Sequence, residues 1–361
     1  MAKGTEPRKK RVSIKDIALA AQASPSAVSF VLSGQQRTYR ISNELAERIR
    51  RTAQELNYTP NGFARSLRKG TNHTIGVIVS DISNPFFADL VRNIEITAEG
   101  YGYMALFASS DEDASKTSLL VEEMLGKGVD GMILVPCDGS KPTIRLLEEK
   151  GVPFVLLDRY FPDLKTNYVA LDNFHAGYNV TAHLIRQGYR KIAMVSYETD
   201  LINIKAREDG YRQALNDADA GDPGIVHAVK MTDSLESGCR KAMQGILHSG
   251  ADAILFATNS LTVQCLHFIK DNNIKIPDDL GLAGFDGGSV FDFFYAPLTY
   301  VDQPLEKMAR KSVEVLIEVM ESGQGMTQNI EMEATLVPRI SSAEKKTFTN
   351  CYQSDSPGAQ E

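Results

Sequence analysis

The first 58 residues carry apolar side chains at helical spacing, and helix-start signals divide them into three short segments. Ser13 and Asp16 stand three residues apart in front of an apolar run, which is the spacing of a capping box. Ser24 and Pro25 offer an N-cap followed by proline at the first helical position, where its missing N–H costs nothing. Apolar residues at steps of three and four after Ser42 predict a third helix. We therefore expect helices over about 14–21, 25–32 and 43–56.

From residue 74 onward, short apolar runs alternate with helical patterns. Repeated strand–helix units predict parallel sheets covered by helices on both faces, and two such blocks predict two similar lobes. After the last helix we expect an extended stretch over 330–340 and a polar, disordered tail from 342. The expected strands are 75–79, 103–107, 131–135, 154–158, 192–196, 225–229, 253–257 and 280–284, and the expected helices are 86–99, 117–125, 143–150, 174–187, 206–216, 235–247, 261–271 and 305–321.

Charge divides the chain at the same place as the hydrophobic pattern. Residues 1–73 carry 14 basic and 5 acidic side chains, a net charge of +9. The remainder carries 25 basic and 41 acidic side chains, a net charge of −16, so the formal total of −7 conceals two opposite parts. A basic head on an acidic body is typical of a protein that binds nucleic acid through the head alone.

Several classes of protein are disfavoured by the composition. No run of about 18 apolar residues exists, so a membrane span is not expected. The polar N-terminus lacks the apolar region of a secretory signal, and four widely spaced cysteines favour reduced thiols over a disulfide framework or a zinc site. We therefore expect a cytoplasmic protein with no metal ion and no cofactor.

The basic head has the organisation of a DNA-binding unit. Two short helices joined by about three residues make a helix-turn-helix, whose second helix can enter the major groove. The segment 60–67 could form a short helix, but it is too short to be stable alone in water. It carries Leu67 among three cations, which suits an element that folds against DNA and wedges a leucine into a minor-groove base step.

Two ordered motifs about 30 residues apart then point to a known family. Ser24-Pro25-Ser26-Ala27-Val28-Ser29 opens the second helix, and Tyr58-Thr59-Pro60-Asn61 is followed by Ala64-Arg65-Ser66-Leu67. Through these motifs the chain resembles the lactose-repressor (LacI/GalR) family of bacterial transcription regulators, and the resemblance extends over about 74–341. It implies a small all-α helix-turn-helix headpiece with a hinge helix, followed by an α/β two-lobed periplasmic-binding-protein-like core that three chain segments cross. The implied parts are a basic arm (1–11), the headpiece (12–58), the hinge helix and linker (59–73), the effector-binding and dimerisation core (74–341) and the tail (342–361).

The resemblance also implies which residues contact DNA. Leu67 would be the minor-groove wedge, and the recognition helix would present its first turn and Phe30 to base edges. Arg, Gln and Asn are absent from the base-reading positions, so readout there would depend on Ser26 and on apolar contact with thymine methyls. The loop 34–40 is also longer than the family pattern leads us to expect. The residues expected at DNA are Pro25, Ser26, Ser29, Phe30, Asn61, Ala64, Arg65 and Leu67.

A ligand site is expected at the strand ends of the body, because ligands of such sheets lie outside the carboxyl ends of the strands. Aromatic, amide, carboxylate and guanidinium groups follow several strands, a mixture that suits a polyhydroxylated ligand. The resemblance implies an effector pocket there and makes Asp172 a weaker candidate. Leu201 stands where the purine-responsive branch has an extra arginine, which argues against a purine, and Asn259-Ser260 replaces a common Asn-Asp. The effector residues expected are Phe86, Phe87, Arg159, Arg207, Asn259 and Asp286.

These observations predict a sequence-specific transcriptional regulator, a repressor, that binds double-stranded operator DNA as a homodimer. A small-molecule effector bound between the lobes, a sugar or sugar derivative, would control operator affinity. One alternative is a solute-binding receptor without a regulatory role, against which the basic head and the missing signal peptide both count. The other is an enzyme, but the chain has no G-x-x-x-x-G-K-[ST], G-x-S-x-G or H-E-x-x-H motif.

Overall fold

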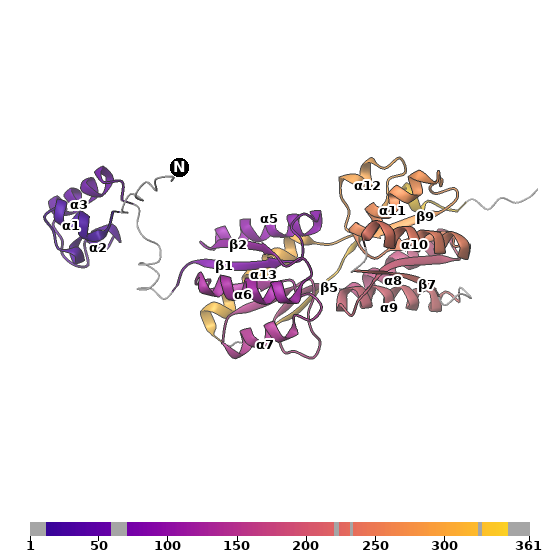
Figure 1. Ribbon diagram of the computed structural model, residues 1–361, viewed down its shortest axis with the longest axis horizontal. Coiled ribbons are helices and arrows are strands. Elements are labelled where there is room, and N and C mark those ends of the chain that lie inside the picture. Colours follow the sequence, from indigo (N-terminus) through magenta and orange to yellow (C-terminus); the bar gives the residue numbers. More distant parts are fainter. Residues whose placement is uncertain (1–11, 59–70, 220–223, 232–233, 324–326, 346–361) are drawn as a thin grey trace, which may run out of the picture. The chain divides into compact units, whose positions relative to one another are not determined.

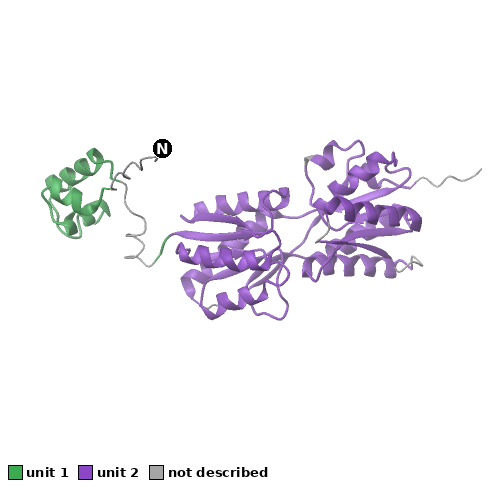
Figure 2. Ribbon diagram, in the orientation of Figure 1, with its two compact units in different colours: residues 1–72 green, residues 73–361 purple. Residues whose placement is uncertain are grey.

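The computed structural model describes residues 12–58, 71–219, 224–231, 234–323 and 327–345. The chain forms two compact units, residues 1–72 and residues 73–361, which are described separately (Figure 2). The hinge segment 59–70, including four of the residues expected at DNA, lies outside the described residues.

The first unit is a bundle of three short helices, as the sequence predicts. Both expected caps are present: the Ser13 hydroxyl accepts a bond from the Asp16 N–H in a capping box, and Ser24 accepts from the Ala27 N–H at 3.1 Å. The apolar faces of the helices meet in one core around Ile17, which is fully buried. The helices are α1 (Ile14–Ala20), α2 (Pro25–Leu32) and α3 (Asn43–Glu55).

The second unit contains two lobes, each a six-stranded sheet with helices on both faces (Figure 1). The sheet of the first lobe has the order β11-β5-β4-β3-β1-β2, and all its pairs are parallel. Fully apolar strands such as β3 are buried on both sides, which explains their continuous hydrophobic runs. Helices α5 and α13 pack on one face and α6 and α7 on the other. The elements are β1 (Thr74–Val79), α5 (Pro85–Gly100), β2 (Met104–Ser109), α6 (Ala114–Gly126), β3 (Gly131–Leu134), α7 (Lys141–Glu149), β4 (Phe154–Leu157), β5 (Tyr168–Leu171), α13 (Leu305–Ser322) and β11 (Asn329–Met332).

The second lobe repeats the plan with the order β12-β10-β9-β8-β6-β7. Its pairs are parallel except for the edge pair of β10 with β12, which is antiparallel. Helices α8 and α9 pack closely against each other, and α10 packs against α11. The elements are α8 (Asn173–Arg186), β6 (Ile192–Glu198), α9 (Ile202–Asp217), β7 (Ile225–Lys230), α10 (Leu235–Ser249), β8 (Ala253–Phe256), α11 (Asn259–Asp271), β9 (Gly281–Phe285), α12 (Ser289–Phe293), β10 (Thr299–Asp302), β12 (Thr335–Val337) and the 3₁₀ turn η1 (Ile340–Ser342).

The chain passes between the lobes three times, as expected: from β5 to α8, from β10 to α13, and from β11 to β12. In Figure 1 the orange and yellow C-terminal segments therefore appear in both lobes. These three crossover segments connect the lobes and form the hinge about which the lobes can move. Each lobe contains elements that follow a crossing from the other lobe.

Two expectations about the C-terminal part are wrong. The stretch 330–340 is not one strand, because β11 and β12 belong to different sheets and Ile340 begins a 3₁₀ turn. Disorder does not begin at 342: Ser342 is buried with its hydroxyl 2.8 Å from Nε2 of His183, and Lys345 lies 2.7 Å from an Asp252 carboxylate oxygen. Ser341 and Ser342 are small polar residues of the kind expected in a tail, but both are buried and hydrogen-bonded. The core therefore extends to Lys345.

Candidate functional site

A cavity of about 280 Å³ lies between the two lobes. Its lining residues follow the carboxyl ends of strands β1, β2 and β4 in the first lobe and β6, β8 and β9 in the second. This is the position that the topology of parallel sheets favours for a ligand. The apolar part of the wall is formed by Phe86 and Phe87, whose rings meet edge to face with centroids 4.9 Å apart.

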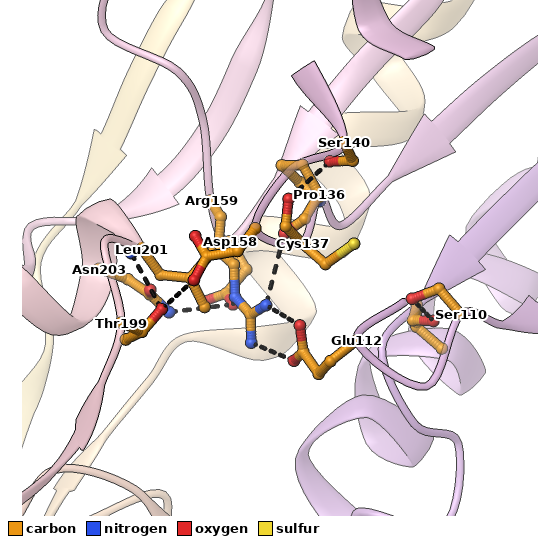
Figure 3. A network of polar contacts seen from close by, with 12 residues as sticks. Ser110, Glu112, Pro136, Cys137, Ser140, Asp158, Arg159, Thr199, Leu201 and Asn203 are labelled. Atoms are coloured by element: carbon orange, nitrogen blue, oxygen red, sulfur yellow. Dashed lines mark hydrogen bonds and ion pairs between the residues drawn. The ribbon is translucent and has the colours of Figure 1, made fainter. Parts of the chain in front are cut away.

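Arg159 is anchored in one wall by a paired carboxylate (Figure 3). Its Nη1 and Nη2 donate to the two carboxylate oxygens of Glu112 at 2.8 and 2.9 Å, a bidentate arrangement. Burial opposes the charge of Arg159, but Glu112, together with Asp158 and Cys137, outweighs burial and raises the pKa of the guanidinium above its ordinary value. The guanidinium charge is thus largely neutralised before any ligand arrives.

Asp158 occupies a strained position beside Arg159. Its backbone has φ 68°, in the left-handed region that residues other than glycine seldom adopt. Its Oδ2 accepts from the Asn203 amide at 3.4 Å and faces Arg159 Nε at the same distance, whereas Oδ1 has no hydrogen-bond partner among the described residues. Burial raises the pKa of this carboxyl above its usual range. Strain and an unpartnered oxygen together are typical of a residue kept for function.

Arg207 is only 2% exposed and is fixed by α8 and β8. Its Nε donates to the Asn173 side-chain oxygen at 2.8 Å, its Nη1 donates to the Ala257 carbonyl at 2.6 Å, and its Cζ lies 4.0 Å from the centroid of the Phe285 ring. Burial lowers its pKa, although Asp286 and Asp158 act in the opposite direction. The guanidinium therefore enters the cavity wall in one orientation.

Asp286 follows β9 and also has a positive φ, 61°. The Gln303 amide donates to its carboxylate at 2.6 Å, and the Asn259 amide donates to its carbonyl at 2.7 Å. Burial raises the pKa of this carboxyl to about 6, against the opposing charge of Arg207.

Four buried polar atoms on the cavity wall have no hydrogen-bond partner within the described part of the chain. Native proteins rarely leave such groups unpaired, because each costs about 1–3 kcal/mol. Their concentration on one cavity indicates a ligand rich in hydrogen-bonding groups. The atoms are Ser80 Oγ, Asp158 Oδ1, Gln303 Oε1 and Arg159 Nε, the last of which is ion-paired with Asp158 Oδ2 at 3.4 Å without forming a hydrogen bond.

Three side-chain hydrogen bonds bridge the lobes across this cavity. The Asn203 amide reaches Asp158, the Thr199 hydroxyl donates to Asp138, and the Asn84 amide donates to Ser260 at 3.4 Å. All three bonds require the lobes to be close, so this is a closed arrangement.

Five of the six expected effector residues line the cavity: Phe86, Phe87, Arg159, Arg207 and Asp286. The sixth, Asn259, is not among the lining residues and instead holds the backbone carbonyl of Asp286. Asp172 lies elsewhere, since it caps α8, pairs with His175 at 2.7 Å and borders a different cavity.

Several cavity residues were missing from the expected set. Glu112 and Tyr197 follow or end strands, so the strand-end rule could have included them. Asn203 lies in a helix and Gln303 on a crossover segment, and only the tertiary arrangement brings them to the cavity.

The expected DNA-facing residues of the first unit are divided between exposed and packed positions. Pro25 and Ser26 are exposed in the first turn of α2, whereas Ser29 and Phe30 are half-buried. The Phe30 ring is stacked on Tyr39, with centroids 3.5 Å apart. The unusually long loop thus returns to cover one face of Phe30. Asn61, Ala64, Arg65 and Leu67 lie outside the described residues.

Within the described residues, no helix is long and apolar enough to cross a bilayer, and no group of acidic, histidine and cysteine side chains could hold a metal ion.

Known proteins resemble the chain over nearly its whole length. The regulator DegA of Bacillus subtilis is 30% identical over 342 residues, covering 93% of this chain and 100% of the relative. The ribose operon repressor of Haemophilus influenzae is 29% identical, covering 91% of this chain and 98% of the relative.

Solved structures give the same picture. The transcriptional regulator CelR in complex with cellobiose is 26% identical, with a TM-score of 0.66, and covers 92% of this chain and all of that chain. The lac repressor dimer bound to operator and an anti-inducer is 20% identical, with a TM-score of 0.81 and the same coverage, and supports the fold.

Two family matches together span both units. Residues 13–61 match the bacterial regulatory proteins of the lacI family. Residues 72–340 match the periplasmic binding proteins and sugar-binding domain of that family. A helix-turn-helix unit, a hinged two-lobed core and these matches lead to one conclusion: the chain belongs to the LacI family of bacterial regulatory proteins.

Proposed function

We propose that this protein is a transcriptional repressor that binds a pseudo-palindromic operator as a homodimer, and that a sugar bound between its lobes controls operator affinity. The observation that carries the effector proposal is the set of four unpartnered buried polar atoms around a cavity walled by two phenylalanines. Sugar hydroxyls would satisfy the polar atoms while the rings cover apolar sugar faces. The ribose and cellobiose named for the relatives belong to the same chemical class.

Control requires that effector and DNA each prefer one of two states. The inter-lobe bonds through Thr199 and Asn203 supply one such state, a closed core. An effector that adds hydrogen bonds on both sides of the cavity would stabilise closure, and the change in the core would order or release the hinge segment. Two recognition helices of a dimer would then engage or leave their half-sites together.

We further propose that the protein is cytoplasmic and that its cavity binds the effector without converting it to a product. Neither a cofactor nor a metal ion takes part. The relatives are transcriptional regulators, which supports a sensor rather than a catalyst. A turnover screen with the sugars that bind should give no product.

Thermal-shift screening of the full chain with a sugar library tests the effector proposal, because a ligand that binds the native state raises the melting temperature by mass action. At least one sugar should raise it, and Asp286→Asn should abolish that response, since Asp286 lines the cavity. If no sugar produces a shift, the effector belongs to another chemical class.

Leu67→Ala tests the proposed minor-groove wedge. We expect the variant to lose about tenfold or more in affinity for an operator selected from random DNA, because unstacking would no longer widen and bend the site. Affinity for nonspecific DNA should change little. Leu19→Ala is the matched control, since Leu19 is 82% exposed on α1 and away from the proposed contacts. Unchanged operator affinity in Leu67→Ala would refute the wedge.

A further inference from the structure

A second cavity, of about 340 Å³, adjoins the effector cavity. The two cavities share three walls, Phe86, Asp286 and Gln303. The remaining lining of the second cavity comes from the start of α5, the turn after β9, strand β10 and the start of α13. A ligand that fills the first cavity and extends past Gln303 would therefore enter the second without leaving the space between the lobes.

Gln303 marks the passage between the cavities as a polar contact site. It is 5% exposed, and its Nε2 donates to Asp286, while no donor in the described part of the chain reaches its Oε1. A buried amide oxygen without a donor indicates that a ligand group supplies one.

The second cavity is acidic. Asp89, Asp286 and Asp302 line it, and its described lining contains no lysine, arginine or histidine. None of the three carboxylates forms an ion pair within the described part of the chain. Burial raises the pKa of Asp302, and the nearby N-terminus of α13, which begins at Leu305, acts in the opposite direction.

The nearest guanidinium groups offset this charge only in part, because two of them face six carboxyl groups on the walls of the two cavities. Arg159 is held bidentately by Glu112, and Arg207 by Asn173, Ala257 and the Phe285 ring. Together the two cavities therefore favour a cation over an anion.

Tyr300 supplies an aromatic surface in the second cavity. Its half-buried ring lies against the backbone of Gly287, where an added Cβ would come within 2.3 Å of Cε2. Gly287 thus allows the ring to pack against the backbone in the same cavity as the acidic groups. An aromatic ring with nearby carboxylates can accept both an apolar sugar face and an ammonium group.

Resting on the proposed function, we propose that the effector is a saccharide of at least two rings that carries a protonated amine, with the aminated ring in the acidic second cavity. Anionic sugars, such as phosphorylated sugars or uronic acids, would be rejected there by like charge.

Three disaccharides with the same linkage isolate the amine: chitobiose with free amines, its N,N′-diacetyl form, and cellobiose. Binding of each to the full chain is measured by thermal shift and calorimetry, beside glucosamine alone. We expect chitobiose to bind on the order of tenfold more tightly than cellobiose at low salt, with the difference shrinking as salt is raised.

Asp89→Asn and Asp302→Asn should each reduce the preference for chitobiose over cellobiose several-fold. Asp278→Asn makes the same charge change at an exposed residue outside both cavities and should leave the preference intact. Each variant's melting temperature without ligand confirms that it folds.

Equal binding of chitobiose and cellobiose would overturn the role of the amine. If glucosamine binds as tightly as chitobiose, the proposal that the effector needs a second ring is wrong. Either result leaves the sugar effector standing, whereas absence of a shift with any saccharide would refute the proposed function as well.

Discussion

At the residue scale, two carboxyl groups of the cavity combine an unfavourable backbone conformation with burial that disfavours their ionised form. Asp158 and Asp286 both have a positive φ, and burial raises the pKa of both carboxyls. A sugar hydroxyl that donates to an ionised carboxylate would offset this cost, because hydrogen bonds to charged acceptors are the stronger kind. These residues thus destabilise the empty protein but contribute favourable interactions once a ligand is bound.

The raised pKa of Asp286 predicts a specific pH dependence of stability. In the unfolded chain this carboxyl ionises near its ordinary value of 3.8, and in the folded protein at about 6. Between these values the folded state binds more protons, so its free energy of unfolding should fall as pH rises, by at most about 3 kcal/mol.

Urea unfolding of the natural chain and of Asp286→Asn across this pH range isolates the contribution of Asp286 ionisation to the free energy of unfolding. The variant cannot ionise, so its stability relative to the natural chain should increase from about pH 4 to about pH 6 and then stay level. A difference between the two chains that does not vary with pH would contradict the prediction.

At the element scale, the close packing of α8 on α9 fixes the position of Arg207. Glycine permits that approach: a Cβ at Gly210 would lie 2.0 Å from the Phe174 carbonyl oxygen, and one at Gly177 would lie 2.3 Å from that of Arg207. Both contacts are with backbone atoms, which cannot move away from an added Cβ as the end of a flexible side chain can.

We therefore expect Gly210→Ala to destabilise the core by about 2–4 kcal/mol and to weaken the effector response, because α9 must shift. Gly126→Ala, at the end of α6 with no atom within 4 Å of the added Cβ, should instead be neutral or stabilising by up to about 1 kcal/mol. Chemical denaturation of both variants checks this, and similar effects in the two would count against the packing argument.

The elements that the sequence predicts well are those with strong local signals. The ends of α2 are predicted to the residue, because Ser24 and Pro25 define its start. Strands β5 and β10 and helix α12 were not expected. Of the site, the strand-end rule and the family resemblance together found five lining residues. Asn203 and Gln303 lack any local signal, because their role depends on where the other lobe lies.

At the scale of the whole molecule, function depends on the balance between open and closed lobes. The Thr199 hydroxyl and Asp138 form one of the bridging bonds. Removing a bond made only on closure makes the closed state less populated, and effector affinity falls by the same factor.

Thr199→Val should therefore weaken effector binding at least about fivefold, for a loss of about 1 kcal/mol from the bridging bond. The substitution also removes the acceptor of the Leu201 N–H within the second lobe. Thr97→Val removes a hydroxyl bonded within α5 to the Asn93 carbonyl, inside one lobe, and should leave effector affinity unchanged. Calorimetric titration of both variants distinguishes them. Equal affinities for Thr199→Val and the natural chain would show that this bond does not contribute to closure.

The sequence by itself determined the division of the chain into two parts with different roles, because charge and hydrophobic periodicity are local properties. They separate a basic three-helix head from an acidic body of alternating strands and helices. Only the tertiary structure decided which polar groups are paired. Arg159 and Arg207 look alike as cations along the chain, yet both are already held by partners distant in sequence. What remains unpaired around the cavity is a property of the folded chain, because burial and partnership exist only once the lobes have come together.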